Sequence, residues 1–244
     1  MTNIEFVNKL IQLSNTKTVY MLGCFGQPVS KSIITQKAKQ IPKWYTEARI
    51  QSLTKLIGTG TFAFDCVGMI KGILWGFDYS FTKSNGGAKY VSAGVADLSA
   101  DQMIKLCNSS SDFTEYIEPG EVVWQSGHIG VYIGNDKVIE CTPKWKNCVQ
   151  VTDITQRAWK KHGKLPFIQY DKQPILTNPV MLVNTKISNL NVRECPNGDI
   201  IGSFKKGIKV KVIKADRSDW ILVEGKDART DKTIRGWCST KYLI

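Results

Sequence analysis

The sequence lacks the features of a membrane-inserted or disulfide-stapled protein. No apolar run is long enough to cross a bilayer, because Lys71 interrupts the longest candidate. The seven cysteines are an odd number and show no paired C-x-x-C spacing. Neither a disulfide framework nor a structural zinc site is therefore indicated. We expect a soluble protein with no metal site and no insertion into a membrane.

The N-terminal stretch MTNIEFVNKLIQLSNTKT also lacks the continuous apolar region of a secretory signal, since Glu5 and Lys9 interrupt it. Its apolar residues recur at helical spacing, and Thr2 or Asn3 is placed to cap the helix. We expect a protein made in the cytoplasm without a signal peptide, which would need another route of release to act outside the cell.

The formal net charge of +12 favours polyanionic partners, among them the phosphate polymers of cell walls. The chain contains no basic helix with interleaved aromatic residues and no recognised nucleic-acid motif. Nucleic acid is therefore not expected as a partner.

The composition and the residue pattern change near residues 171–185, where two prolines and several polar residues follow the last aromatic cluster of the first part. Short β-type runs separated by turn residues come after this change, which is typical of a small barrel. The pattern predicts a first domain over 1–170, a linker over 171–185 and a barrel over 186–244.

Within the first part, helical patterns precede strand patterns. The helical signals extend to about residue 110 and are broken by a partly irregular insertion over 27–60. From Glu118 the runs EVVW, HIGVYIG, KVIEC and VQVTDI follow one another as strands. Helices followed by an antiparallel meander predict an α+β architecture.

Cys66 is the first candidate for chemistry. It follows Asp65, which is placed to cap a helix beginning with the cysteine. The positive end of a helix stabilises a thiolate, so this position predicts a lowered thiol pKa. The alternative, a buried structural cysteine, is favoured by residue statistics unless a general base lies nearby.

Two histidines are available as that base. His162 lies in the basic stretch WKKHGK, which indicates an exposed side chain without a special role. His128 opens HIGVYIG, in which Ile129 and Val131 alternate with it, so one strand face is apolar and the other carries the imidazole.

Glu140 follows His128 by twelve residues, across a GND turn. It shares the face of His128 only if the hairpin loop has an odd length or contains a bulge. In that case it would orient the imidazole as the third member of a triad. A rim carboxylate facing water is the alternative.

These blocks resemble the NlpC family of cell-wall cysteine peptidases, whose core is papain-like. The resemblance rests on FDCVG, EPGEVV and GHIGVYIGNDKVIE in that order. It implies Cys66 as nucleophile, His128 as general base and Glu140 as the third polar residue. VYMLGC is similar to a further family motif and implies that Tyr20, with Asp65, contacts the stem peptide.

The chain departs from this family at three points. Val67 replaces a serine that helps to bind substrate, Cys24 replaces a glycine, and the stretch between Tyr20 and Cys66 is longer than usual. These departures bear on the choice of substrate more than on the reaction.

The second part resembles a bacterial SH3 (SH3b) domain, through LNVR at its start and RGWCSTKYL near its end. Such modules bind peptidoglycan. Trp220, Trp237 and Tyr242 would line a groove, although a core position is the preferred interpretation for Trp237.

Together the two resemblances imply an endolysin-like or autolysin-like peptidoglycan hydrolase that acts on the bacterial cell wall without a cofactor. The expected reaction is cleavage of a stem-peptide amide, by resemblance the bond between γ-D-glutamate and the diamino acid. An N-acetylmuramoyl-L-alanine amidase with the same Cys/His pair is one alternative. A wall-binding protein without activity is the other.

Overall fold

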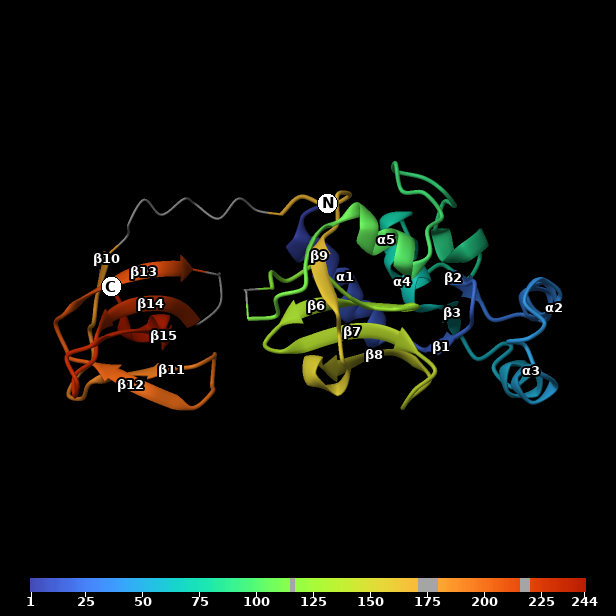
Figure 1. Ribbon diagram of the computed structural model, residues 1–244. Helices are drawn as coiled ribbons and strands as arrows, with labels where there is room; N and C mark the ends of the chain where they lie inside the picture. The colour runs from blue at the N-terminus through green and yellow to red at the C-terminus, as the bar shows by residue number, and fades with distance from the viewer. Residues whose placement is uncertain (115–116, 171–179, 216–219) are drawn as a thin grey trace. The chain divides into compact units, whose positions relative to one another are not determined.

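The computed structural model describes residues 1–114, 117–170, 180–215 and 220–244 (Figure 1). The chain divides into two compact units, Met1–Asp171 and Lys172–Ile244. Each unit has its own hydrophobic core, so each is considered by itself.

The first unit combines helices, most of them in its N-terminal half, with a following run of strands. Its α-helices are α1 (Asn3–Ser14), α2 (Lys31–Gln40), α3 (Glu47–Thr54), α4 (Cys66–Leu74) and α5 (Ala100–Leu106). Its strands are β1 (Thr18–Tyr20), β2 (Phe25–Pro28), β3 (Phe62–Phe64), β4 (Asn108–Ser110), β5 (Val122–Gln125), β6 (His128–Gly134), β7 (Lys137–Thr142), β8 (Cys148–Asp153) and β9 (Lys161–Lys164). The α+β architecture predicted from the sequence is therefore present.

The main sheet of this unit has the strand order β4-β9-β5-β6-β7-β8 among the described residues, and its pairs are antiparallel. One face packs against α1, α4 and α5 through alternating apolar residues, among them Ile129, Val131 and Ile139. A smaller sheet, β1-β3-β2, leads directly into α4. The opposite face of the main sheet carries His128 and Glu140.

Helix α4 is buried along its whole length. Two glycines on one side of it, Gly68 and Gly72, let neighbouring backbone approach closely. A Cβ on Gly68 would lie 2.0 Å from the carbonyl oxygen of Cys24, and one on Gly72 would lie 2.4 Å from that of Phe25. The segment around β2 is thus packed backbone to backbone against the helix that begins with Cys66.

The insertion predicted over 27–60 is more regular than expected, because it forms α2 and α3. Ser30 caps α2 by accepting a hydrogen bond from the N–H of Ile33. The two helices enclose a small apolar cluster that includes Ile33, Tyr45 and Leu53. The polar composition of the segment masked this cluster in the sequence.

The second unit consists of strands around a small core. They are β10 (Val180–Leu182), β11 (Leu190–Arg193), β12 (Ile200–Phe204), β13 (Lys209–Ala215), β14 (Trp220–Lys226) and β15 (Thr233–Ser239), in the sheet order β10-β13-β14-β15-β11-β12. Strand β10 lies inside the predicted 171–185 linker and pairs with β13. Residues 171–179 of that linker lie outside the described residues.

None of the helices in the described ranges combines the length and the apolar composition that a membrane span requires.

The close approach at Gly72 gives a stability prediction. In an ordinary helix interior Gly→Ala stabilises by about 1 kcal/mol. Here the new methyl group meets the Phe25 carbonyl at 2.4 Å, so we expect Gly72→Ala to lower the free energy of unfolding by about 1–3 kcal/mol. Urea unfolding measures the change, with Ser52→Ala on the exposed surface of α3 as a control that should be nearly neutral. Stabilisation by Gly72→Ala would contradict the packing described above.

Candidate active site

A bulge in the β6–β7 hairpin decides which side chains share a face. Val131 is opposite Ile139, but Gly134 is opposite Lys137, so the register shifts by one residue between Tyr132 and Gly134. Continuing the Val131 pairing places Glu140 opposite Gly130, on the face that also carries His128. The condition that the sequence analysis set for Glu140 is met through the bulge.

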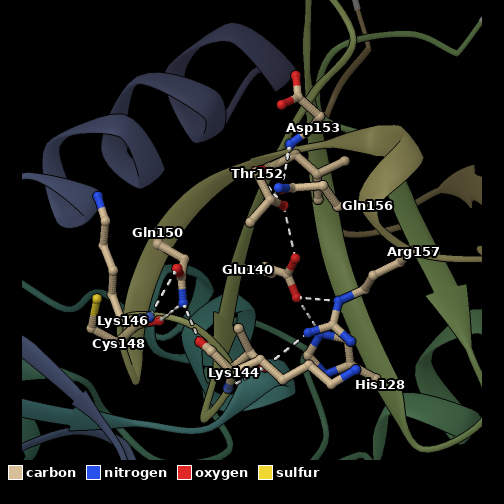
Figure 2. Close-up of polar contacts among 12 residues, drawn as sticks. His128, Glu140, Lys144, Lys146, Cys148, Gln150, Thr152, Asp153, Gln156 and Arg157 are labelled. Atoms are coloured by element: carbon tan, nitrogen blue, oxygen red, sulfur yellow. Dashed lines mark hydrogen bonds and ion pairs between the residues drawn. The ribbon is translucent and has the colours of Figure 1, made fainter.

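His128 and Glu140 are joined by a hydrogen bond. The distance between His128 Nε2 and Glu140 Oε2 is 2.7 Å, and Figure 2 shows the ring directed at the carboxylate. Thr152 Oγ1, on the neighbouring strand β8, donates to the other carboxylate oxygen at 2.7 Å. Since Glu140 is 0% exposed, the alternative of a rim carboxylate facing water is wrong.

Arg157 is a member of this group that the sequence analysis missed. It follows the short 3-10 helix η2 (Ile154–Gln156), and its Nε donates to Glu140 Oε2 at 2.6 Å (Figure 2). Its Nη2 donates to Thr142 Oγ1 at 2.8 Å. In the sequence this arginine is one of many basic residues, so no local signal distinguishes it.

The electrostatic state of Glu140 follows from these contacts. Burial alone would raise the pKa of the Glu140 carboxyl. The hydrogen bonds from His128 and Thr152, together with the charges of His128 and then of Arg157, outweigh burial and hold that pKa below its usual range. The carboxylate is therefore ionised at neutral pH although it has no contact with water.

Two tryptophans flank the group. The ring of Trp159 stacks on His128, with 5.8 Å between centroids and 16° between planes. The guanidinium of Arg157 lies 5.0 Å from the ring centroid of Trp145, which is exposed. Stacking on one side and the hydrogen bond to Glu140 on the other fix the orientation of the imidazole.

Cys66 begins α4, and Asp65 caps this helix by accepting a hydrogen bond from the N–H of Gly68 at 2.6 Å. The pairing of β6 with β7 ends at Val131 and Ile139, and beyond it the N–H of Ile129 faces the Cys66 sulfur. The residue after His128 therefore lies against the thiol.

The protonation of Cys66 differs from the expectation. Burial, followed by the charge of Asp65, raises the pKa of the thiol to about 12, while the N–H groups of Ile129, Val67 and Cys66 itself lower it. The prediction of a lowered pKa is wrong for this structure because desolvation outweighs the helix terminus. The residue is only 5% exposed, so its sulfur does not lie in an open cleft.

Asp65 and Tyr20, the predicted substrate contacts, are also buried. Both oxygens of Asp65 accept backbone hydrogen bonds, from Gly68 and, at 2.7 Å, from Gly23. Burial and the neighbouring Cys66 and Asp65 raise the pKa of the Tyr20 hydroxyl. The Tyr20 ring lies 5.7 Å from that of Trp44, in the segment between α2 and α3. Their contact with a substrate stays a prediction.

The two departures from the family pattern near the thiol are core residues. Val67 is 7% exposed and belongs to the main hydrophobic cluster, and Cys24 is fully buried in the cluster under α2 and α3. Burial raises the pKa of Cys24 to about 12. Neither side chain faces solvent in this structure.

His162 corrects a second expectation, since it is buried rather than exposed. It pairs with Val123 in the β5–β9 ladder and is buried, whereas Lys161 and Lys164 at the two ends of β9 are exposed. Its Nδ1 is 2.8 Å from Glu121 Oε2, and its Nε2 is 3.1 Å from the carbonyl oxygen of Asp112. These contacts tie β9 to the residue before β5 and to the segment after β4, so the role of His162 in this structure is to hold the fold together.

Within the described residues, no cluster of three or more His, Cys, Asp or Glu side chains is placed to hold a metal ion.

The second unit has a clear relative. Residues 188–244 match the family described as "Bacterial SH3 domain", which confirms the SH3b resemblance over nearly the whole predicted barrel. The C-terminal unit therefore contains a bacterial SH3 domain.

Comparison of the whole chain with known proteins identifies no family for the first unit. No curated protein matches the chain. Two solved structures show a distant likeness. One is described as "The crystal structure of Ly7917", with a TM-score of 0.22, 16% identity, and coverage of 72% of this chain and 83% of that one. The other, the same protein "with the hydrolyzing product of MDP", has a TM-score of 0.19, 17% identity, and coverage of 55% and 61%. Similarities of this size do not indicate the fold or the function of this chain.

The double contact of Asp65 predicts a structural cost. Asp65→Ala removes a helix cap and leaves the partly buried N–H of Gly23 without an acceptor, so we expect a loss of about 2 kcal/mol in the free energy of unfolding. Thr46→Ala is the matched control, because Thr46 is the N-cap residue of α3 but makes no side-chain cap bond. Equal losses in the two variants, measured by urea unfolding, would show that the carboxylate contacts do not stabilise the fold.

Proposed function

We propose that the first unit is a papain-like cysteine peptidase of the NlpC type that hydrolyses peptidoglycan, and that the second unit binds the cell wall. The observation that carries the proposal is the His128–Glu140 hydrogen bond, on a strand whose next residue faces the Cys66 thiol. A nucleophile, a base and a group that orients the base are the parts that acyl transfer by cysteine requires.

In the proposed reaction His128 accepts the proton of the Cys66 thiol as the sulfur attacks an amide carbonyl of the stem peptide. A C–S bond forms, the amide C–N bond breaks, and the imidazolium returns the proton to the leaving amine. Water then hydrolyses the thioester, with His128 acting again as the base. Glu140 holds the imidazole and stabilises its charged form. No metal or cofactor takes part.

The raised pKa of the Cys66 thiol determines when its proton leaves in this mechanism. A thiol with a pKa of about 12 is protonated at neutral pH, so the proton must leave during the attack and not before it. Because Cys66 is almost completely buried, a substrate carbonyl reaches the sulfur only after neighbouring side chains move.

The proposed scissile bond joins γ-D-glutamate to the diamino acid of the stem peptide. The same Cys/His pair serves an N-acetylmuramoyl-L-alanine amidase equally well. Mass spectrometry of digested sacculi separates the two: a new free amine on the diamino acid supports the peptidase, whereas release of intact stem peptides from muramic acid supports the amidase.

A wall-binding protein without activity is the second candidate, and the buried, protonated thiol favours it. Its signature would be a wild-type chain that sediments with purified walls and releases no fragments from them.

Removing the thiol tests the cysteine mechanism. We expect Cys66→Ala to abolish the loss of turbidity of a wall suspension, because no other group supplies the nucleophile. Cys148→Ala is the control, since Cys148 is half buried at the start of β8 and should be dispensable. Undiminished lysis by Cys66→Ala would exclude the proposed mechanism.

Wall binding by the second unit is assigned to the outer face of its sheet. Trp237 is opposite Leu222 on β14 and Arg193 on β11, whereas the adjacent Cys238 points into the core. The core position preferred for Trp237 from the sequence is therefore wrong. The guanidinium of Arg193 lies 5.9 Å from the ring of Trp220. Aromatic and cationic groups thus share one face, which suits a peptide or an anionic polymer.

The aromatic residues of this face give a binding prediction. We expect Trp220→Ala and Trp237→Ala to weaken sedimentation with purified walls by about tenfold or more, because aromatic side chains commonly dominate binding energy. Ile200→Ala serves as the control at an exposed apolar position on β12. An equal loss in all three variants, or no loss in either aromatic variant, would exclude this face.

A further inference from the structure

The net charge of the first unit is concentrated in the segment 27–60, which contains α2 and α3. Met1–Asp171 has nineteen basic and fourteen acidic residues, of which six basic and one acidic lie in 27–60. The rest of the unit therefore has thirteen of each sign, and the whole excess of +5 belongs to 27–60. Because α2 and α3 lie beside each other at one end of the unit, this charge is gathered in one region (Figure 1).

Most of these charges face solvent. Lys31, Lys39, Lys43 and Lys55 are exposed. Within the ranges that the structure describes, none of the four forms an ion pair with a carboxylate. The single acidic residue of the segment is Glu47. The repulsion among the lysines is thus not balanced inside the protein, and an external anion would relieve it.

A shallow groove follows the exposed side of α2 and is open to solvent. Its volume is about 510 Å³, and it is lined by Lys31, Ser32, Thr35, Gln36 and Lys39. Lys31, Thr35 and Lys39 recur every four residues, so they lie along one stripe of the helix. Ammonium, hydroxyl and amide groups all donate hydrogen bonds, and phosphate oxygens accept them.

The position of Lys31 opposes the local stability of α2. It is the first residue of the helix, where the helix dipole favours an acidic residue, and the first turn contains none. Lys37 and Lys39 lie in the last turn, where the dipole favours a cation. Helix stability therefore accounts for the lysines at the end of α2 and not for the one at its start, although both ends of the groove carry a cation.

The spacing of these cations indicates the kind of anion that fits. Lys31 and Lys39 are eight residues apart, which is about 12 Å along a helix axis. One phosphate group is too small to contact both, whereas a chain with repeated phosphates reaches each of them. Five of the six basic residues of the segment are lysines, which bind phosphate as point charges and not through a planar fork. The pattern fits a flexible polymer with charge along its backbone.

The apolar residues of the two helices are turned away from this surface. Ile33, Ile34 and Leu53 are buried in the cluster that the helices enclose. A helix that lies in a membrane interface presents apolar side chains beside its cations. A groove for single-stranded nucleic acid presents aromatic rings on which the bases stack. The five residues that line the groove include neither an apolar nor an aromatic side chain.

The segment between α2 and α3 contacts the candidate active site. The ring of Trp44 lies 5.7 Å from that of Tyr20, and the Tyr45 hydroxyl donates to the carbonyl oxygen of Leu22 at 2.8 Å. The Arg49 guanidinium lies 4.0 Å from the centroid of the Trp44 ring and donates to the carbonyl oxygen of that residue at 2.7 Å. A polymer bound along α2 is thus held by an element that is fixed to the candidate active site.

We propose that α2 and α3 form a binding surface for an anionic phosphate polymer of the cell wall, with the groove along α2 at its centre. The surface belongs to the first unit, so it acts in addition to the second unit, and two modules on one chain that bind the same wall raise the overall avidity. The inference goes beyond the proposed function, because it requires neither the Cys66 thiol nor the hydrolysis of any bond.

The test measures the affinity of the full-length chain for soluble poly(glycerol phosphate) by calorimetry, at salt concentrations between about 0.05 and about 0.2 M. One variant replaces the four exposed lysines of the segment: Lys31→Gln, Lys39→Gln, Lys43→Gln and Lys55→Gln. The matched control replaces four exposed lysines from the rest of the first unit: Lys9→Gln, Lys89→Gln, Lys105→Gln and Lys161→Gln. The two variants have the same net charge.

We expect the variant in 27–60 to bind the polymer about tenfold or more weakly than the wild type at the lowest salt concentration. Its affinity should also fall less steeply with salt, by about 2–3 in the slope of log affinity against log salt, because each phosphate paired with a lysine releases a counterion. The control should lose less than about threefold. Equal losses in the two variants would show that total charge alone binds the polymer, which overturns the proposal.

A second measurement locates the polymer on the wild-type chain. We expect poly(glycerol phosphate) to shift the amide NMR signals of Ser32, Thr35 and Gln36, and inorganic phosphate at the same phosphate concentration to leave them in place. Unshifted signals with the polymer overturn the proposal even if the variant in 27–60 does not fold. Equal shifts with inorganic phosphate also overturn it, since the groove would then bind a single anion.

The class of polymer is tested with the same two variants. Vesicles of phosphatidylglycerol and single-stranded polyuridylate replace the poly(glycerol phosphate) at the same salt concentrations. We expect the variant in 27–60 to lose less affinity for either of them than for the wall polymer. A loss as large for the vesicles or for polyuridylate would assign the surface to a membrane or to nucleic acid and overturn the proposal. None of these measurements depends on lysis, so they stand even if the proposed function fails.

Discussion

The polar face of the main sheet depends on a single buried charge. The Glu140 carboxylate is inaccessible to water, so its neighbours must supply every interaction that solvent would otherwise provide. They come from different elements: His128 from β6, Thr152 from β8 and Arg157 from the segment after η2. Neutralising one charge therefore fixes the relative positions of three parts of the chain.

The other side of the same strands is governed by packing. Ile129, Val131 and Ile139 meet α4, and Cys66 lies among them at the start of that helix. A thiol in these surroundings is desolvated, which opposes ionisation more strongly than the helix terminus favours it. The sheet thus separates an ionic group from a neutral thiol, and the thiol contacts β6 through the backbone N–H of Ile129, the residue after His128.

Patterns within a few residues were enough to predict much of this arrangement. Period-two alternation located β5 to β8, and an aspartate before an apolar run located the start of α4. What depended on distant residues was not predictable. Arg157 meets Glu140 only after η2 turns the chain, and the pKa of Cys66 depends on how deeply the finished fold buries it. His162 was misjudged because the lysines beside it lie at the exposed ends of β9, while the histidine itself lies in the buried middle.

The bulge in β6 has a consequence for how this chain tolerates change. If the same residues paired regularly from the turn onward, Glu140 would lie opposite Val131 and turn toward the helices, into an apolar layer without a counter-charge. Replacing a turn residue leaves the face of every later side chain as it is. The buried charge therefore depends on the register of β6 against β7, and a slip of that pairing by one residue should be far more damaging than a substitution in the turn.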